Sequence, residues 1–437
     1  MRHTLLLFLW LLPAAAAATE VTYVTCGKLF DAANAKMLGA HVVEVREGRF
    51  SAVNIGQADA AKQATVGVDG VTAVKQIDLS AHTCMPGFID MHVHLRGETS
   101  PQRYSEGFRL NSADFAFRSV GYAEKTLMAG FTTVRDLGGE VTLSLRDAIN
   151  QGLLRGPRIF AAGTGISTTG GHGDPTNGVA HYLSDALGHP GPEEGVISGV
   201  DEARRAVRQR YKEGSDVIKI AATGGVLSVA KSGENPQFTA DEVAEVVRTA
   251  RDYGLRVAAH AHGKEGIRRA IEGGVDSIEH GTFLDDELFA LMKKNDTWYV
   301  PTVLAGTFVA EKAKEPGYFP EIVRVKAAAI GPQIKATFGR AYRAGVKIAF
   351  GTDSGVSPHG DNAREFELMV EAGMPPLEAI QSATRNAAQL LDRWNDLGSV
   401  SVGKHADLVA VEGDPQANIS ILRSVDFVMK GGTIHKQ

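Results

Sequence analysis

Short apolar runs alternate with segments of helical period between residues 86 and 394. Runs of this kind are typical of parallel strands that are buried on both faces. A loop and a segment of about ten or more residues with helical periodicity follow each run, for example Asp241 to Tyr253. The eight runs are Phe88 to Leu95, Thr132 to Asp136, Arg158 to Ala162, Asp216 to Ala221, Arg256 to Ala261, Ser277 to His280, Trp298 to Thr302 and Lys347 to Thr352.

Eight β/α units of this length predict an α/β fold, a closed (β/α)8 barrel of the TIM type over residues 86–394. An open doubly wound sheet is the structural alternative. Such sheets often bind a dinucleotide through a Gly-x-Gly-x-x-Gly turn, and the sequence places no such motif between a strand and a helix. The barrel is therefore the favoured prediction.

The two ends of the chain have a different pattern. From Val21 to about Met85, short β-branched runs are interrupted by Gly, Asn and Asp, and the segments Leu408 to Val411 and Phe427 to Met429 resemble them. This pattern is typical of antiparallel strands and turns. We expect residues 19–85 and 395–437 to form one small β domain.

The first 18 residues resemble a secretory signal. Arg2 precedes an apolar run from Leu5 to Leu12, and the alanine tract that follows offers a cleavage site near Ala18. The run is shorter than the roughly 20 apolar residues that span a bilayer. We therefore expect export to the periplasm or the medium, with no membrane anchor after cleavage.

Charge and cysteine content exclude several classes of protein. The formal net charge is -5 and the basic residues are scattered, so neither a nucleic-acid surface nor a polybasic membrane site is indicated. The only cysteines, Cys26 and Cys84, exclude a disulfide-dense scaffold and a cysteine-based zinc ribbon. A single bridge and two buried thiols are both compatible with the sequence.

Side chains of metal-ligand type stand at the ends of the predicted strands. His92 and His94 project from one face of the first strand, because successive side chains alternate between faces. Each residue taken alone has a simple explanation: Lys219 could hold its ammonium in solvent, and Asp353 could cap a helix. Their coincidence at the strand ends, where barrel enzymes have their active sites, indicates a metal centre. The set comprises His92, His94, Lys219, His260, His262, His280 and Asp353.

These residue types suit a pair of divalent cations. Neutral imidazole nitrogens bind zinc-like ions, and two cations about 3.5–4 Å apart need an anionic bridge. The buried Lys219, carboxylated by CO2, would supply two such oxygens. Asp353 could bind one cation and accept a proton from metal-bound water, whose pKa falls to about 7.

The motifs resemble those of the amidohydrolase superfamily along essentially the whole mature chain. The resemblance is to the branch related to imidazolonepropionase, with exported metal-dependent amidases, Xaa-Pro dipeptidases and ochratoxin-hydrolysing amidases. The segments that carry it are Pro86 to His94, Gly130 to Asp136, the Lys219 strand, His260 to Gly263, Ser277 to Gly281, Gly351 to Asp353 and Gly403 to Val409.

This resemblance implies a barrel with a small β-sandwich built from both chain ends. It also implies two divalent metal ions, with Zn²⁺ the first expectation. His92, His94 and Asp353 would bind one ion, His260 and His280 the other, and carboxylated Lys219 would bridge them. In addition, it implies that His262 and His172 contact the substrate. His172 lies in the long loop between Gly163 and Gly199, and a solvated position in that loop is the alternative for it.

The implied activity is hydrolysis of an amide in small N-acyl amino acids or dipeptides by a metal-bridging hydroxide, with Asp353 relaying the proton. The alternatives within the superfamily are a cyclic-amide or lactone hydrolase and a deaminase; a bridging Lys219 argues against the mononuclear deaminases. An exported metal- or solute-binding protein is the alternative without catalysis. The resemblance further favours a homo-oligomer.

Overall fold

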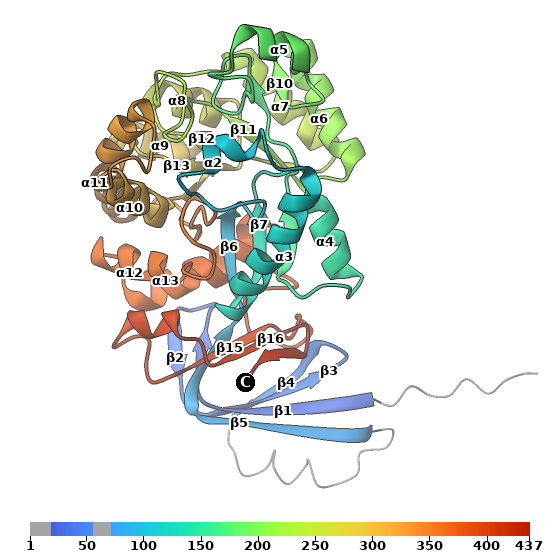
Figure 1. The fold of residues 1–437 in the computed structure, drawn as a ribbon. Coiled ribbons are helices and arrows are strands. Elements are labelled where there is room, and N and C mark those ends of the chain that lie inside the picture. The colour runs from blue at the N-terminus through green and yellow to red at the C-terminus, as the bar shows by residue number, and fades with distance from the viewer. Residues whose placement is uncertain (1–18, 56–70) are drawn as a thin grey trace, which may run out of the picture.

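The computed structural model describes residues 19–55 and 71–437. The predicted signal segment, residues 1–18, lies outside the described residues. Figure 1 shows an α/β part with helices around short strands, and below it a sheet formed by strands from both chain ends. Among the described helices, none is long and apolar enough to cross a membrane.

Two parallel sheets form the centre of the α/β part. The first pairs β6 (Phe88–Val93), β7 (Phe131–Asp136) and β8 (Arg158–Ala161), and the second pairs β11 (Val217–Ala221), β12 (Arg256–Ala261), β13 (Ser277–His280) and β14 (Trp298–Val300). Nearly every residue of these strands is buried, because helices cover the outer faces of the sheets and side chains fill the space inside. Seven of the eight predicted strands are therefore confirmed.

The eighth predicted strand, residues 347–352, is extended but is not part of a sheet. An isolated bridge joins Ile348 to Tyr299 of β14, and a second one, just beyond the segment, joins Ser354 to Val93 of β6. A third bridge, Ile166 to Ile220, connects the chain after β8 to β11. The α/β class is thus confirmed, whereas the described residues contain no single closed sheet of eight strands, because these junctions have too few consecutive hydrogen bonds.

Helices follow the strands as the periodicity predicts. The helix predicted at Asp241 to Tyr253 is α7 (Ala240–Asp252), whose first turn is closed by reciprocal hydrogen bonds between Thr239 and Glu242. The other helices are α2 (Arg103–Glu106), α3 (Ser112–Met128), α4 (Thr142–Asn150), α5 (His181–Leu187), α6 (Val200–Glu213), α8 (Lys264–Glu272), α9 (Asp286–Lys294), α10 (Val303–Lys312), α11 (Glu321–Arg343), α12 (Arg364–Glu371), α13 (Pro376–Gln381) and α14 (Ala387–Leu390), with a π-helix, η1 (Ser382–Asn386), before α14.

The long loop after β8 contains little regular structure. It has a two-stranded parallel pair, β9 (Ser167–Thr168) and β10 (Val196–Ile197), and the helix α5. The isolated β-bridge between Ile166 and Ile220 connects the start of this loop to β11. The loop is consequently anchored beside the carboxyl end of β11.

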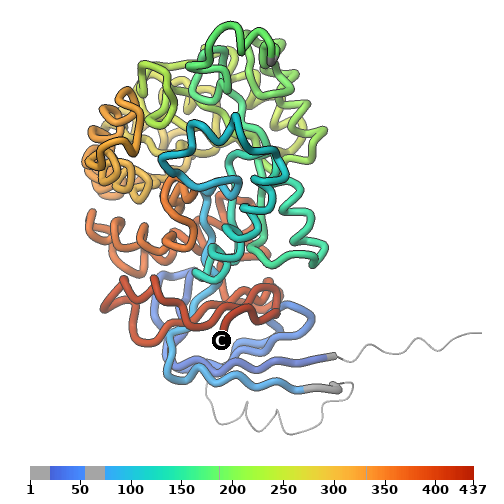
Figure 2. Tube along the Cα trace, viewed as in Figure 1, coloured from blue at the N-terminus to red at the C-terminus, as the bar shows by residue number. Residues whose placement is uncertain are grey.

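Strands from both chain ends combine in one eight-stranded sheet. Its order is β17-β16-β15-β5-β1-β3-β4, with β2 paired to β1. Figure 2 shows the last segment of the chain beside the first strands. The strands are β1 (Thr19–Asp31), β2 (Lys36–Leu38), β3 (His41–Arg46), β4 (Arg49–Ile55), β5 (Val71–Pro86), β15 (Leu408–Glu412), β16 (Phe427–Lys430) and β17 (Thr433–Lys436), while the 3-10 helix η2 (Ile419–Arg423) follows β15.

This sheet differs from the prediction in two respects. The strands are hydrogen-bonded into one sheet, so a sandwich of two sheets is not confirmed. In addition, β1 and β5 are long and pair in parallel, whereas the other pairs are antiparallel as predicted. Parallel pairing is compatible with the sequence because β2, β3, β4 and further residues separate the two strands along the chain.

Cys26 of β1 and Cys84 of β5 form a disulfide bond. Both residues are fully buried in the core of the sheet. The structure therefore selects the bridge over two separate thiols, which the sequence left open.

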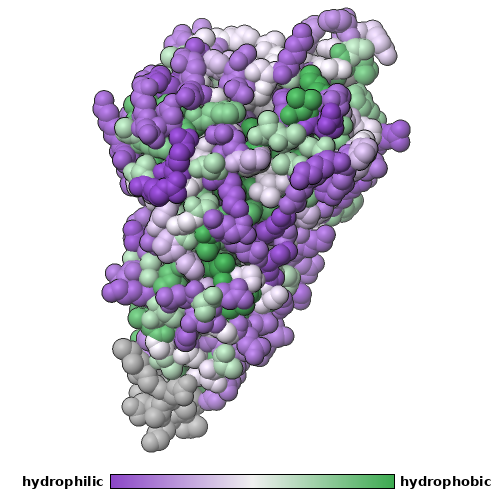
Figure 3. Space-filling model, turned by 90° about the vertical axis from the view of Figure 1, so that its left-hand side faces the viewer, coloured by the Kyte–Doolittle hydropathy of each residue, from purple (hydrophilic) through white to green (hydrophobic). Residues whose placement is uncertain are grey.

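Buried polar contacts attach this sheet to the α/β part. The carboxylate of Asp407 accepts a hydrogen bond from Arg158 Nη1 at 2.7 Å and, on its other oxygen, one from the Gly431 backbone at 2.8 Å. The Gly87 amide donates to the Asp407 carbonyl at 2.9 Å. Figure 3 shows a largely hydrophilic outer surface with smaller hydrophobic patches between. The two parts share one apolar core, which includes Met85, Phe88 and Val409.

Candidate metal centre

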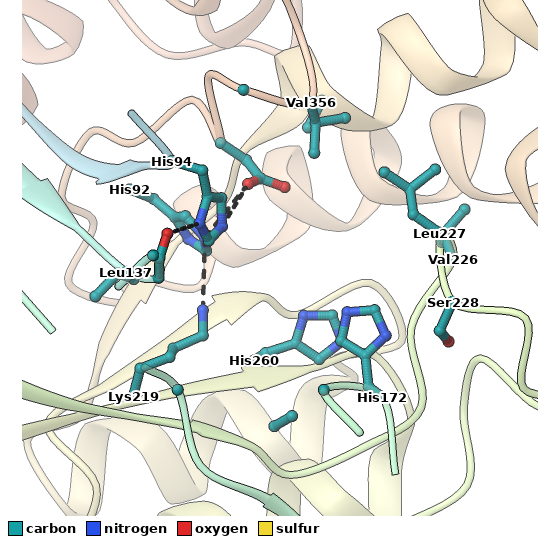
Figure 4. A pocket seen from close by; sticks show the side chains of 18 of the residues that line it. His92, His94, Leu137, His172, Lys219, Val226, Leu227, Ser228, His260 and Val356 are labelled. Carbon is teal, nitrogen blue, oxygen red and sulfur yellow. Dashed lines mark hydrogen bonds and ion pairs between the residues drawn. The ribbon is translucent and has the colours of Figure 1, made fainter. Parts of the chain in front are cut away.

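A cavity of ≈ 590 Å³ opens at the carboxyl ends of the parallel strands. Figure 4 shows His92, His94, His260 and Lys219 projecting into this cavity from strands or strand ends, and His172 reaching it from a loop. All the site residues that the sequence predicts line it, namely His92, His94, His172, Lys219, His260, His262, His280 and Asp353. The tertiary structure thus brings together residues that are up to 261 positions apart, the interval from 92 to 353.

Asp353 lies against the histidine pair of β6. Its Oδ1 atom is 3.4 Å from His92 Nε2 and 3.2 Å from His94 Nε2. This oxygen is buried and accepts no hydrogen bond among the described residues. Burial alone would raise the pKa of Asp353, but the adjacent His92, His94 and Lys219 lower it to about 2. Asp353 therefore presents an ionised oxygen that lacks a donor.

Three side chains of metal-ligand type form one compact cluster. Ligand atoms of His92, His280 and Asp353 all lie within 4.8 Å of one another. His92 and Asp353 belong to the ligand set predicted for one ion, and His280 belongs to the set predicted for the other. The two predicted ligand sets are consequently adjacent, as a pair of neighbouring cations requires.

Lys219 of β11 lies beside the same group. Its Nζ atom is 3.5 Å from His92 Nε2, and the residue is 8% exposed. Burial lowers the pKa of the Lys219 ammonium to about 8, and the neighbouring Arg135 adds to this effect while the carboxylates of Glu279 and Asp353 oppose it. At pH 7 about one tenth of the amine is therefore neutral, and the neutral amine is the form that reacts with CO2.

His260 and His280 face each other across the ends of β12 and β13. Their ring centroids are 4.6 Å apart. His260 Nε2 lies 3.1 Å from the Gly224 carbonyl, and His280 Nδ1 lies 2.7 Å from Thr302 Oγ1. Burial holds the pKa of both imidazoles well below the ordinary value, so both rings are neutral and each has a nitrogen lone pair.

His262 and His172 extend the cluster toward the rest of the cavity. The His262 ring stacks on His280 with centroids 5.0 Å apart, and its Nδ1 is 2.8 Å from Thr282 Oγ1. The His172 ring stacks on the His260 ring, with centroids 4.4 Å apart and an angle of 17° between the ring planes. Figure 4 shows the two rings side by side. His172 is half-buried and lines the cavity, and its Nδ1 atom is buried without a hydrogen bond among the described residues. Its contact with substrate stays a prediction.

Two charged residues that the sequence motifs contained without an assigned role support His92. Glu279 Oε2 lies 2.9 Å from His92 Nδ1, and Glu279 Oε1 accepts a hydrogen bond from Arg135 Nη2 at 2.7 Å. Arg135 also donates to the Met91 carbonyl at 2.7 Å. Burial alone would raise the pKa of Glu279, but Arg135 and His92 lower it to about 2. The sequence signal that could have revealed Glu279 and Arg135 is that each is a charged residue inside an otherwise apolar strand.

A buried carboxylate joins β6 to the segment before Asp353. Asp90 accepts hydrogen bonds from the His92 amide at 3.0 Å, from the Thr352 hydroxyl at 2.6 Å and from the Asn362 side chain at 2.8 Å. The Asp353 amide in turn donates to the His92 carbonyl at 2.7 Å. These bonds hold His92 and Asp353 in register although the segment is not part of a sheet.

A second chain of contacts orients His280. Thr302, which bonds to the His280 ring, is the N-cap residue of α10 and adopts a left-handed conformation with φ 52°. The next amide, Val303, donates to Glu365 Oε1 at 2.9 Å, and the Leu304 amide donates to the other oxygen. His280 and Asp353 are also left-handed, with φ 70° and 58°. Non-glycine residues rarely adopt this conformation, and it is typical of functional sites.

The donor set fits divalent cations. Neutral imidazoles, an ionised carboxylate oxygen without a hydrogen-bond donor and a reactive amine converge in one cavity. Buried ionised oxygens that lack a partner are costly, and a cation would compensate the charge. The cavity at the strand ends, where barrel enzymes have their active sites, therefore holds a group of side chains that could bind a divalent metal ion.

Comparison with known proteins supports the same class. The model of the Amidohydrolase family matches residues 83–435, and the chain belongs to this family. The chain is accordingly a hydrolase, and the family implies a (β/α)8 barrel. The prediction of this superfamily is thus confirmed.

Several relatives resemble the chain over most of its length. It is 35% identical over 367 residues to an ochratoxinase from Aspergillus niger, covering 80% of this chain and 75% of the relative. It is 24% identical over 426 residues to an imidazolonepropionase from a Geobacillus species, covering 91% of this chain and 92% of the relative.

Solved structures are also similar. A Xaa-Pro dipeptidase with bound methionine in its active site is 50% identical, with a TM-score of 0.89, covering 95% of this chain and 100% of that protein. A prolidase complexed with N-methylphosphonate-L-proline is 31% identical, with a TM-score of 0.84 over 95% of this chain and 100% of that protein.

Proposed function

We propose that this protein hydrolyses the amide bond of dipeptides or small N-acyl amino acids with the aid of two divalent cations. The observation that carries the proposal is the buried Asp353 Oδ1, which has no hydrogen bond among the described residues and lies within 3.4 Å of two imidazole nitrogens. The names of the related Xaa-Pro dipeptidase, prolidase and ochratoxinase support an amide or dipeptide as substrate.

The residues would hold the cations in two adjacent sets. His92, His94 and Asp353 would bind the first, while His260 and His280 would bind the second. Lys219 would bridge them as a carbamate, which forms when its neutral amine adds to CO2 and releases a proton. Bound divalent cations polarise a carbonyl and lower the pKa of water enough to supply hydroxide near neutral pH. Zn²⁺ is the first expectation, although imidazole and carboxylate ligands also bind other divalent metals.

The protein's own groups supply orientation and proton transfer. The pKa of Asp353 is lowered to about 2, so its carboxylate is ionised at neutral pH. In the proposed reaction it would accept a proton from the water that the cations activate and deliver it to the departing amine nitrogen. The neutral His262 and His172 rings line the same cavity and can each donate one hydrogen bond to a substrate oxygen. Glu279 fixes the orientation of His92 through the Nδ1 contact at 2.9 Å.

Three assays separate this proposal from its alternatives. Purified protein is incubated with Xaa-Pro dipeptides, Xaa-Phe dipeptides and N-acyl amino acids, and free amino acid is measured. Parallel incubations contain cyclic amides, lactones and aminated heterocycles, which test for a cyclic-amide or lactone hydrolase and a deaminase. Metal content is measured on the same sample. Amino acid release with close to two ions per chain supports the proposal, whereas metal without hydrolysis of any substrate supports a metal- or solute-binding protein.

The same proposal includes an exported homo-oligomer. The apolar run after Arg2 and the alanine tract support cleavage of a signal near Ala18. Amino-terminal sequencing of protein recovered from the periplasm or medium tests the cleavage. Light scattering coupled to gel filtration tests the oligomeric state against a chain mass of 46.5 kDa.

A further inference from the structure

The cavity wall opposite the metal-ligand residues is apolar. Figure 4 shows Val226, Leu227 and Val356 on the far side of the cavity from Lys219 and His92. Helices α10 and α11 complete this wall, so loop and helix side chains pack into one surface. The apolar wall is defined by Val226, Leu227, Val309, Ile330, Ile334 and Val356. A wall of this composition suits a bulky apolar group of a ligand.

Part of the apolar wall is a loop with no regular structure. The segment 224–230, here called the β11 loop, follows β11 and contributes Val226 and Leu227. Its first residues also contact the histidine cluster: the Gly224 carbonyl bonds to His260 Nε2 at 3.1 Å, and a Cβ atom at Gly225 would lie 2.1 Å from the His172 ring. Displacement of the β11 loop would therefore alter both the wall and the support of the histidines.

Lys326 of α11 holds the β11 loop by three hydrogen bonds. Its Nζ atom donates to the carbonyls of Gly225 at 2.9 Å, Ser228 at 2.7 Å and Ala230 at 2.9 Å. These bonds use all three protons of the ammonium. On another side, the Tyr104 hydroxyl donates to the Leu227 carbonyl at 2.9 Å. Four carbonyls of one short segment are thus fixed from outside it.

The charge of Lys326 has no carboxylate partner. No acidic group of the described residues lies within ion-pairing distance of its Nζ. Burial lowers the pKa of Lys326 to about 8. An ammonium withdrawn from water is costly unless its hydrogen bonds are replaced, and here backbone carbonyls replace them. The arrangement therefore ties α11 to the β11 loop through three backbone carbonyls.

We propose that Lys326 is a positioning residue that shapes the apolar wall and so determines selectivity for substrates whose amine-side residue carries a bulky apolar side chain. This inference rests on the proposed amide hydrolysis. The amine side is assigned because Val356 of the apolar wall follows Asp353 in a tight turn, in which the Val356 amide donates to the Asp353 carbonyl at 2.9 Å. Asp353 protonates the departing amine in the proposed function, so the side chain on that amine lies nearest the apolar wall.

Lys326→Met tests the inference, because methionine keeps the aliphatic length and removes the three donors. Two dipeptides, Gly-Phe and Gly-Gly, are compared by their separate kcat and KM values. For Gly-Phe we expect the KM to rise about 10-fold with a smaller change in kcat, and for Gly-Gly little change, so that the ratio of the two kcat/KM values falls about 10-fold. Lys326→Arg, which keeps the charge and several donors, should recover part of the ratio.

The matched control is Lys335→Met on the same helix, because Lys335 pairs with the exposed Glu371 and lies outside this contact. It should leave the ratio unchanged. Hydrogen exchange of amides 224–230 should accelerate in Lys326→Met and not in Lys335→Met. Leu227→Ala, which removes part of the apolar wall and leaves Lys326 in place, should lower the same ratio even if Lys326→Met fails to fold.

The outcomes separate this inference from the proposed function. If the unaltered protein cleaves no dipeptide, Xaa-Pro dipeptides included, and no N-acyl amino acid, the proposed function is wrong. If it cleaves them and Lys326→Met changes both substrates equally, or neither, the inference about selectivity is wrong while the proposed function stands. An unchanged ratio in Leu227→Ala would likewise overturn it.

Discussion

His92 Nδ1 and Glu279 Oε2 lie 2.9 Å apart, and both side chains are completely buried. The other oxygen of Glu279 accepts a hydrogen bond from Arg135, which is itself 2% exposed. The contact fixes which nitrogen of His92 carries the proton and leaves Nε2 facing Asp353. A glutamate with no assigned role in the sequence motifs thereby orients a predicted metal ligand.

Glu279→Gln should weaken the protein in two ways. Removing the carboxylate leaves the buried Arg135 uncompensated, which costs about 3–5 kcal/mol of unfolding free energy. It also loosens His92, so metal affinity should fall about 10- to 100-fold. Urea unfolding and metal titration measure the two effects. Glu287→Gln, which removes the exposed ion pair between Glu287 of α9 and Arg268 of α8, is the control and should change neither quantity by much.

Asp353→Asn should retain the fold and lose hydrolysis. Asparagine keeps the shape of the side chain but cannot accept the proton from water, so kcat should fall about 100-fold or more. Asp361→Asn, which changes an exposed partner of Arg423, serves as the control. Turnover at the unaltered rate in Asp353→Asn would show that the assigned role is wrong.

Lys219→Ala should abolish tight binding of two metal ions per chain. The substitution removes the amine that would form the bridging carbamate, and added short-chain carboxylic acids should restore part of the binding and activity. Metal analysis after dialysis measures the stoichiometry. Two ions per chain in Lys219→Ala without such additives would contradict the carbamate.

Thr302→Val should lower metal affinity through His280. Valine preserves the volume of threonine and removes the hydroxyl that lies 2.7 Å from His280 Nδ1. We expect about 10- to 100-fold weaker binding of one of two ions, whereas Thr302→Ser, which keeps the hydroxyl, should bind nearly normally. Equal affinities of the two variants would show that this contact does not orient His280.

The buried histidines of the metal-free protein should contribute less to stability as the pH falls below about 6.5. Burial lowers the pKa of His92 and of His262 to about 4, so these groups take up protons on unfolding at pH values between 4 and 6.5. Their contribution is therefore fully present above pH 6.5 and decreases as the pH falls toward 4. The raised pKa values of Asp90, Asp136 and Glu365 act in the opposite sense over this range, so the comparison is made with His262→Gln, which lacks one of the histidines. Urea unfolding of both proteins at pH 7.5, 6 and 5 measures the effect, and an identical pH dependence of the two would contradict it.

A second loss of stability should follow in more acidic solution. The pKa of Glu279 is lowered from 4.5 to about 2, so its contribution is present above pH 4.5 and decreases toward pH 2. Glu279→Gln lacks this carboxylate, and its stability should depend less steeply on pH below 4.5. The comparison of the two proteins isolates the effect of this one group.

The sequence by itself predicted seven of the eight strands, the helix at Asp241 to Tyr253 and the residues that meet in the cavity. Buried strands and helices have distinct periods, and ligand types at strand ends form a local signal. The eighth segment was predicted as a strand because Lys347 to Thr352 is apolar. Whether such a run joins a sheet depends on hydrogen bonds to its neighbours, which no local pattern contains.

Tertiary structure alone decided several features of the site. Glu279 and Arg135 are 144 residues apart, and their contact exists only because β7 and β13 direct both side chains into one buried interior. The stacking of His172 on His260, the hydrogen bond from the Val303 amide to Glu365 and the binding of Lys326 to three carbonyls have the same origin. Residue types and their spacing along the strands determined which chemistry is available, because ligand identity and side-chain alternation are local. Which groups orient those ligands and shape the cavity depends on packing between distant segments, so only the folded chain determines it.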